Sequence, residues 1–256
     1  PNFGRWPEAH IQQKLNKLAE EAREKGIEGG NISNYVLKKY KPSVGKDDLP
    51  YDAYSDGAIA KHGTQLMEKM AQEDKPFFLA VGFKKPHLPF CAPKKYWDLY
   101  DRNDFSLAGY QKKAKNSPDL AYHNFGELRS YSDIPNEGPV SPEKQKELIH
   151  GYYAATSFID QMVGMLTHKL QELNLEKNTI VILWGDHGWH LGDHNLWCKH
   201  SNFEQATRTP MIIKYPGQKK IGKQYWHPTE YVDIAPTLCQ LTGLEIPEYF
   251  QGKSLV

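Results

Sequence analysis

The residues best suited to chemistry gather between positions 185 and 200, directly after a predicted strand. Two carboxylates, four histidines and Lys199 occur within this short span. The preceding run, Ile180 to Trp184, is continuously apolar and rich in β-branched residues, which is typical of a buried strand. Because ligands in open α/β sheets bind beyond the carboxyl ends of the strands, we expect a functional site at this strand end.

Four of these side chains predict the chemistry of that site. Asp186 and His187 supply a carboxylate oxygen and an imidazole nitrogen, and together they form half of a site for a divalent cation. The same pair could instead hydrogen-bond around a tight turn. Lys199 can bind a tetrahedral anion that the metal also holds. His87 lies between two prolines that restrict its backbone and can donate a proton, although it could also be incidental to a stiff turn. This set predicts hydrolysis of a sulfate or phosphate ester.

Composition narrows the class of protein. The 256 residues are 39% hydrophobic and 25% charged, which suits one large α/β domain or two small ones. A net charge of +1 gives no electrostatic reason to expect nucleic acid or a membrane surface as a partner. No apolar run reaches the roughly 20 residues of a membrane-spanning helix. The three cysteines are widely spaced, which excludes zinc-ribbon, thioredoxin and disulfide-framework classes.

Hydrophobic periodicity and turn residues predict the elements that position these side chains. Asp56 is the candidate N-cap of one helix, which Asp74 and Lys75 close, and Ser141 with Pro142 begins another. A helix followed by an apolar strand favours a parallel α/β sheet. We expect irregular chain over 31–54 and a lid or substrate-facing loop over 107–142. The expected helices are 7–25, 56–75, 141–173 and 232–241, and the expected strands are 76–83, 180–184 and 210–215.

Six segments carry a family resemblance. They are KPFFLAVGFKKPHLPF (75–90), GYYAATSFID (151–160), GDHGWHLGDH (185–194), WCKHSNF (197–203), YVDIAPTL (231–238) and QGKSL (251–255). In this order they resemble the sulfatase family, most closely its iduronate-2-sulfatase-like branch, over most of the chain from residue 56 onward. The resemblance implies an alkaline-phosphatase-like α/β fold with a mainly parallel central sheet flanked by helices. It also implies a metal-dependent sulfatase that uses calcium, or magnesium in its place, and a formylglycine nucleophile made from a cysteine or serine.

The resemblance assigns roles by position. Asp186 and His187 match the family's C-terminal pair of metal ligands. Lys199 matches the lysine that contacts the sulfate ester, and His87 matches the active-site histidine that follows a strand. The supporting substrate-binding residues of the same motif are His190 and His194.

The departures from the family pattern are as informative as the matches. The paired N-terminal aspartates and the Cys/Ser-x-Pro/Ala-x-Arg nucleophile motif have no counterpart in this sequence. Cys91 opens a near match, but Lys95 stands where arginine is needed, and the segment falls where the family has a structural turn. We therefore expect residues 1–256 to be an incomplete sulfatase catalytic domain that lacks the N-terminal nucleophile region and the final C-terminal subdomain. This chain alone is predicted to be inactive.

Two other functions remain open. A phosphohydrolase or phosphodiesterase of the same superfamily, with zinc or manganese, would use a similar cation and lysine. A non-catalytic carbohydrate-binding remnant of the fold would explain the missing nucleophile and the many aromatic residues. For the enzyme, the expected partner is a sulfated small molecule or glycan. A polyanionic glycan would suit four basic residues, which could equally be solvated surface: Lys84, Lys85, Lys94 and Lys112. By resemblance the enzyme works in the periplasm, outside the cell or in lysosomes.

Overall fold

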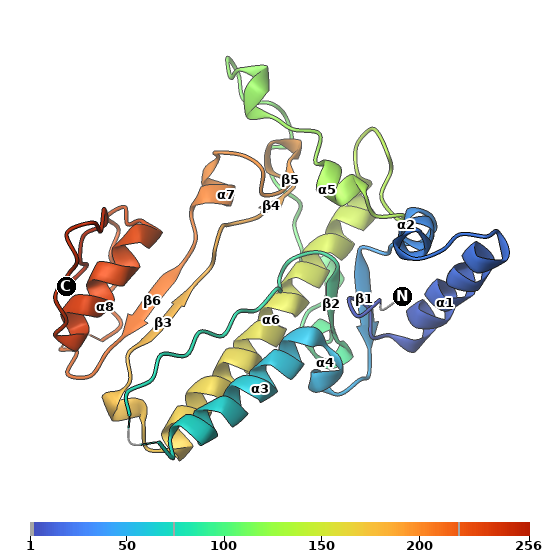
Figure 1. Ribbon diagram of the computed structural model, residues 1–256. Coiled ribbons are helices and arrows are strands. Elements are labelled where there is room, and N and C mark those ends of the chain that lie inside the picture. Colours follow the sequence, from blue (N-terminus) through green and yellow to red (C-terminus); the bar gives the residue numbers. More distant parts are fainter. Residues whose placement is uncertain (1–2, 74, 220) are drawn as a thin grey trace. The chain divides into compact units, whose positions relative to one another are not determined.

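The computed structural model describes residues 3–73, 75–219 and 221–256 as an α/β protein (Figure 1). The chain divides into two compact units. The larger comprises Pro1–Leu175 and Trp184–Pro210, and the smaller comprises Glu176–Leu183 and Met211–Val256. None of the helices formed by the described residues combines the length and apolarity needed to cross a bilayer. Asp74, predicted to close a helix, lies outside the described residues.

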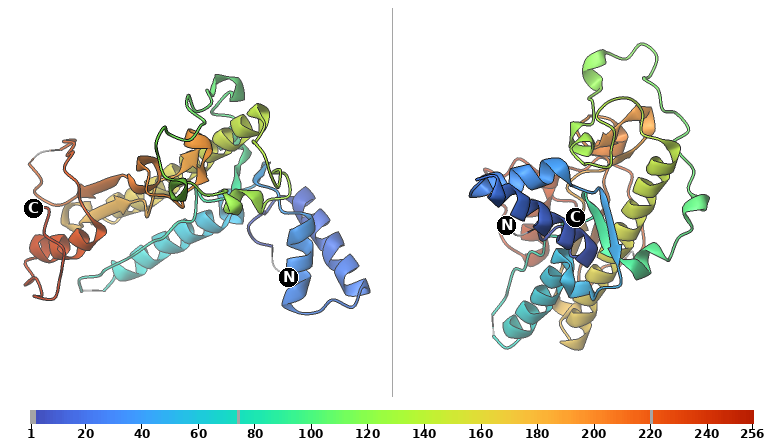
Figure 2. Two further views of the ribbon diagram at one scale, coloured as in Figure 1. Left: turned by 90° about the horizontal axis from the view of Figure 1, so that it is seen from above. Right: turned by 90° about the vertical axis from the view of Figure 1, so that its right-hand side faces the viewer.

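Two long helices form the centre of the larger unit. α3 (Ser55–Met70) and α6 (Pro142–Glu172) lie side by side (Figures 1 and 2). As predicted, Ser141 caps α6, because its Oγ accepts a hydrogen bond from the Lys144 amide at 3.3 Å. One face of α6 is core because apolar residues recur at three- and four-residue steps. Its buried apolar residues include Leu148, Ala154, Ala155, Phe158 and Met162.

Short strands and further helices pack around this pair. β1 (Val44–Asp47) and β2 (Phe90–Pro93) form a parallel pair, and α6 packs against β2. β4 (His190–Leu191) and β5 (Trp197–Cys198) form an antiparallel pair. The other helices of this unit are α1 (Ala9–Glu24), α2 (Gly30–Lys39), α4 (Lys94–Trp97), α5 (Gly126–Arg129) and α7 (Glu204–Thr207).

The smaller unit is built on two paired strands and one helix. β3 (Val181–Trp184) pairs with β6 (Met211–Lys214), and α8 (Ile234–Thr242) follows later in the chain. α8 ends at Gly243, which adopts a left-handed conformation with φ of 73°. Both strands and this helix agree with the predicted elements to within two residues at each end.

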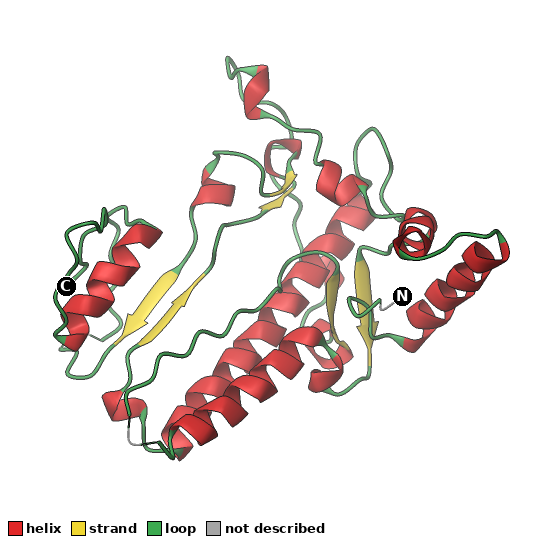
Figure 3. Ribbon diagram, viewed as in Figure 1, coloured by secondary structure: helices red, strands yellow, loops and turns green. Residues whose placement is uncertain are grey.

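Several predictions about the first half of the chain are wrong. Residues 76–83 form no strand, and Figure 3 draws them as loop. An apolar run becomes a buried strand only when its backbone finds partners, and here Phe78 is 79% exposed. Residues 31–54, predicted as irregular, contain most of α2 and all of β1. This polar segment still contains apolar residues, and α2 packs against α1 with Ile32 and Val36 buried.

Two finer predictions also fail. Asp56 does not cap α3, since the helix follows Tyr54 and Asp56 lies in its first turn. The strand at 180–184 is not fully buried, because Leu183 and Trp184 are 40% and 46% exposed. A continuous apolar run does not by itself fix which faces of a strand are covered.

A glycine in α6 tests the packing of the larger unit. A Cβ at Gly151 would lie 2.8 Å from Trp97 Cη2 and 2.9 Å from Phe90 Cβ. Gly151→Ala should therefore lower the free energy of unfolding by about 1–3 kcal/mol, despite the gain in helix propensity. Gly164→Ala in the same helix meets nothing within 4 Å and should raise the free energy of unfolding by roughly 0.5–1 kcal/mol. Urea unfolding measures both, and equal effects would contradict this account of how α6 packs on α4 and β2.

Candidate functional site

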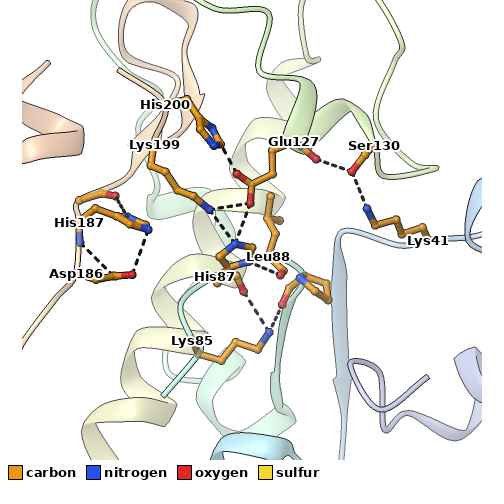
Figure 4. Close-up of polar contacts among 12 residues, drawn as sticks. Lys41, Lys85, His87, Leu88, Glu127, Ser130, Asp186, His187, Lys199 and His200 are labelled. Atoms are coloured by element: carbon orange, nitrogen blue, oxygen red, sulfur yellow. Dashed lines mark hydrogen bonds and ion pairs between the residues drawn. The ribbon is translucent and has the colours of Figure 1, made fainter. Parts of the chain in front are cut away.

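Three side chains from distant parts of the sequence meet in the larger unit (Figure 4). Lys199 Nζ lies 2.8 Å from His87 Nε2 and 2.9 Å from Glu127 Oε1. His87 Nε2 lies 2.9 Å from the same carboxylate oxygen. His87 precedes β2, Glu127 lies in α5, and Lys199 directly follows β5. The structure thus brings together two of the predicted site residues and adds a carboxylate that the sequence did not single out. We call these three residues the Lys199 triangle.

Hydrogen bonding defines the state of the imidazole. His87 Nδ1 lies 2.7 Å from the carbonyl oxygen of Leu88 and must donate to it. Burial is the main reason that the pKa of His87 lies below its usual value, so the neutral form is favoured. In that form Nε2 carries a lone pair, which accepts a hydrogen bond from Lys199. The nearby charge of Glu127 acts in the opposite direction and favours the imidazolium.

Asp56 and Lys85 hold the loop that carries His87. The Asp56 carboxylate accepts hydrogen bonds from the backbone amides of Lys84 and Lys85, at 2.9 and 3.1 Å. Lys85 Nζ donates to the carbonyl oxygens of His87 and Pro89, at 3.1 and 2.5 Å. The backbone on both sides of His87 is therefore fixed by charged groups.

This arrangement corrects one part of the predicted glycan surface. The Lys85 ammonium turns inward to these carbonyl oxygens, and burial lowers its pKa. Lys94, another lysine of that set, pairs with Asp98. A charged residue near a cleft can bind backbone or a neighbouring carboxylate instead of solvent or ligand, and sequence does not distinguish these uses.

Glu127 is the residue of this candidate site that sequence reasoning missed. Its side chain is 20% exposed and that of Lys199 is 18% exposed, so this ion pair is largely sheltered from water. The Lys199 ammonium also lies over the Trp189 ring, 5.0 Å from its centroid. The other carboxylate oxygen of Glu127 lies 3.7 Å from His200 Nδ1. No motif marks Glu127, because it stands 72 residues from Lys199 in a long irregular segment.

Asp186 and His187 lie on a tight turn after β3. The His187 amide donates to Asp186 Oδ1 at 3.1 Å, and Asp186 Oδ2 lies 3.5 Å from His187 Nε2. His187 Nδ1 donates to the carbonyl oxygen of Gly188 at 2.8 Å, which leaves the Nε2 lone pair available to a cation. A Cβ at Gly188 would lie 2.1 Å from the carbonyl oxygen of Gln205, so the turn requires glycine there.

Trp189 connects this pair to the Lys199 triangle. Its ring stacks on His187, with centroids 6.1 Å apart, and meets His87 edge-on at 5.5 Å. His187, His87 and Lys199 therefore all contact one indole ring, and Asp186 lies next to His187 in the chain.

The Asp186–His187 pair fits as part of a cation site. A carboxylate oxygen and an imidazole nitrogen are both cation ligands, but calcium takes six to eight ligands, mainly oxygens. No group of three or more His, Cys, Asp or Glu side chains in the described part of the chain has an arrangement that could hold a metal ion. The Asp186 side chain is 85% exposed. A complete site would need further ligands beside these two.

The two supporting histidines lie in different surroundings. His190 is completely buried, and its Nε2 lies 2.7 Å from Ser201 Oγ. Burial lowers the pKa of His190 to about 4, so it is neutral at pH 7. His194 stacks on Phe203 with centroids 4.9 Å apart and lines a cavity of about 460 Å³. Substrate contact by either histidine stays a prediction.

Cys91 is unsuited to nucleophilic attack. Its side chain is completely buried in β2, and burial raises the pKa of its thiol well above the usual value. This agrees with the rejection of the near match to the nucleophile motif.

The charge of Glu127 can be tested through His87. Glu127→Gln removes the negative charge that favours the imidazolium, so the pKa of His87 should fall further. NMR titration of the His87 ring protons measures this shift. Glu137→Gln, an exposed site in the same loop region, is the control and should leave the His87 titration unchanged. An unchanged or higher pKa of His87 in the Glu127 variant would refute the coupling.

His190 should make stability depend on pH. Its folded-state pKa of about 4 lies below its unfolded value of about 6.5, so the unfolded chain takes up the proton first as the pH falls. Stability contributed above pH 6.5 is therefore lost progressively down to about pH 4, by roughly 2 kcal/mol. Urea unfolding across this range should show a weaker pH dependence for His190→Gln than for the parent. His62→Gln, at an exposed position of α3, should behave like the parent.

Comparisons with known proteins place the chain in a family. The family model described as Sulfatase matches residues 12–244. Human iduronate 2-sulfatase is 33% identical over 230 residues, covering 78% of this chain and 42% of that protein. A sulfatase of Formosa agariphila is 32% identical over 229 residues, covering 86% of this chain and 44% of that protein. The chain thus spans less than half the length of these curated relatives.

Solved structures show the same fold. The phosphonate monoester hydrolase of Silicibacter pomeroyi has a TM-score of 0.71 at 23% identity, covering 93% of this chain and 49% of that one. A protein solved with its substrate D-glucosamine-2-N,6-O-disulfate has a TM-score of 0.62 at 23% identity, covering 79% of this chain and 51% of that one. These likenesses confirm the alkaline-phosphatase-like α/β fold. With the match over residues 12–244, they make this chain a member of the sulfatase family.

Proposed function

We propose that the protein is a sulfuric ester hydrolase that acts on sulfated carbohydrates. The observation that supports this best is the 2.8 Å contact between Lys199 and His87, which are 112 residues apart in sequence. These are the two positions where the family resemblance expects the sulfate-contacting lysine and the active-site histidine. The Glu127 carboxylate holds both groups, and an ammonium beside an imidazole also suits a site for a tetrahedral anion.

The geometry suggests a role for each residue of the Lys199 triangle. Lys199 neutralises charge on a non-bridging oxygen of the ester, in surroundings sheltered enough to strengthen the attraction. His87 takes up a proton from solvent at Nε2, a step that the charge of Glu127 favours, and gives that proton to the oxygen of the departing alcohol, which returns His87 to its neutral form. Glu127 holds the ammonium in place between reactions.

Cofactors and chain completeness belong to the same proposal. Asp186 and His187 would contribute two ligands to calcium, or to magnesium in its place. The cation would supply Lewis acidity, and a formylglycine would supply the covalent nucleophile. We propose that residues 1–256 are the C-terminal part of a catalytic core and are inactive without the segment that carries the nucleophile and the other metal ligands.

The proposed substrate class comes from the relatives. An iduronate 2-sulfatase and a protein bound to D-glucosamine-2-N,6-O-disulfate both act on sulfated sugars, as their names and titles state. We extend this class to the present chain, with a glycosaminoglycan-derived sugar as the leading example. By the same family resemblance, we propose that the activity belongs to the periplasm, the outside of the cell or lysosomes.

A phosphate or phosphonate ester hydrolase is the second candidate. This candidate is supported by the fold match to the phosphonate monoester hydrolase. A lysine and a cation also bind sulfate and phosphate groups alike. A binding protein without chemistry is the remaining alternative, and it predicts no turnover of either ester.

The experiment compares an aryl sulfate with the matching aryl phosphate. The protein as its gene encodes it, supplied with calcium, should hydrolyse the sulfate in preference to the phosphate, whereas residues 1–256 alone should hydrolyse neither. Lys199→Ala should lower kcat by roughly 10²–10³-fold, the usual effect of removing a charge-stabilising group. Lys84→Ala, which removes an exposed ammonium three residues before His87, should change kcat less than about twofold.

Metal binding provides a separate readout. Asp186→Asn removes the charge of one proposed ligand and should weaken calcium binding by about tenfold or more in calorimetry.

The ester assay separates the three candidate functions. Faster hydrolysis of the phosphate than of the sulfate would favour the second candidate. If the encoded protein hydrolysed neither ester, the binding protein would be the remaining function.

A further inference from the structure

A cavity of about 460 Å³ lies in the larger unit, and one of its lining residues, Phe125, is two positions before Glu127 of the Lys199 triangle. Residues 111–113, 122–125 and 194–196 line it, so two parts of the long irregular segment close it against the chain that links β4 to β5. Its volume lies within the range of pockets that hold small ligands. Its lining combines two lysines, side-chain amides, two imidazoles and aromatic rings, which suits a sugar that carries negative charge.

One lysine of the cavity is available for a ligand and the other is occupied. Lys113 Nζ pairs with Asp119 at 2.6 Å. The exposed Lys112 ammonium has no hydrogen-bond or ion-pair partner in the part of the chain that the structure describes. The Lys112 backbone is fixed instead, because its carbonyl oxygen accepts a hydrogen bond from His194 Nδ1 at 3.3 Å. A held backbone with an uncommitted ammonium suits the binding of a ligand carboxylate or sulfate.

His123 offers a second donor. Its Nδ1 accepts a hydrogen bond from the Phe125 amide at 2.9 Å, and burial lowers its pKa, so the neutral ring carries its proton on Nε2. That Nε2 is buried without a hydrogen-bond partner among the described residues. An unsatisfied buried donor is costly, and a ligand oxygen would satisfy it. The neighbouring ring is His200, whose side chain is 61% exposed.

The cavity walls are held rigidly from behind. The Tyr122 hydroxyl contacts the Ala114 amide at 2.7 Å and Ser117 Oγ at 2.8 Å, which fixes that ring. Three lining residues that are not glycine have positive φ, a strained conformation that persists where surrounding structure enforces it. They are Phe125 at 44°, His194 at 54° and Asn195 at 59°.

A chain of contacts joins the cavity to the Lys199 triangle. The His123 and His200 rings lie 6.0 Å apart, and His200 Nδ1 lies 3.7 Å from Glu127 Oε2. Glu127 in turn pairs with Lys199. A ligand with one anionic group at Lys199 and another at Lys112 would therefore pass His200 and His123, along groups that can hydrogen-bond to sugar hydroxyls.

We propose that this cavity is a subsite for the anionic sugar residue adjoining the one that carries the scissile sulfate. Lys112 binds the carboxylate or second sulfate of that sugar, and His123 Nε2 donates to one of its oxygens. This inference rests on the proposed function and adds to it, because it makes the preferred substrate a charged oligosaccharide and not an isolated sulfated sugar.

The experiment measures binding of a fluorescently labelled heparin tetrasaccharide by anisotropy at fixed ionic strength. It uses the protein as its gene encodes it. Lys112→Ala should weaken binding about five- to tenfold, as expected for a charge-assisted contact that is partly exposed. Lys112→Arg, which keeps the charge, should bind within about twofold of the parent. Lys115→Ala removes an exposed ammonium from the same segment outside the cavity and should also stay within about twofold.

The outcomes separate the subsite from the proposed function. Equal weakening by the Lys112 and Lys115 alanine variants would mean non-specific charge attraction and would overturn the subsite. Failure of the parent protein to bind the tetrasaccharide would overturn it as well. Aryl sulfate turnover by the parent, measured in parallel, decides the proposed function independently, because an aryl sulfate has no second anionic group to occupy the cavity.

Discussion

The site depends on a balance of charge within the Lys199 triangle. An ammonium that is 18% exposed needs a partner, because removing a charge from water without compensation is costly. Glu127 provides the compensation, and His87 remains neutral mainly because it is partly buried. Its hydrogen bond to the Leu88 carbonyl oxygen acts in the opposite direction and favours the imidazolium. The result is a sheltered cation beside an imidazole that can receive a proton at Nε2 and then give it up. In the proposed function, the cation binds a tetrahedral anion and the imidazole protonates the departing alcohol.

Each member of the triangle is positioned by a different kind of element. His87 stands on a loop fixed from behind by Asp56 and Lys85. Glu127 stands on a single helical turn within a long irregular segment, and Lys199 follows a strand of two residues. Short elements hold the chemistry, while the long helices α3 and α6 provide the packed core beneath them. Trp189 joins the triangle to the Asp186–His187 turn through ring contacts instead of hydrogen bonds.

Much of the fold could be predicted from local sequence. Serine and proline at the start of α6, its apolar stripe and the glycine after α8 are local features with local consequences, and each prediction was confirmed. The prediction of a strand at 76–83 was wrong because a strand depends on pairing partners that its own sequence does not specify. Within the site, His87 and Lys199 were identified by motif, and the structure brings them together. Glu127 and Asp56 were missed as site residues because their importance comes only from distant segments that fold onto them.

The attachment of Asp56 gives α3 a mechanical part in the site. The carboxylate sits in the first turn of a 16-residue helix that packs along α6, and it holds the backbone two and three positions before His87. A slide of α3 along its groove on α6 would pull on that backbone and carry the imidazole away from the ammonium. The packing of the two helices therefore helps to set the position of His87, although His87 belongs to neither helix.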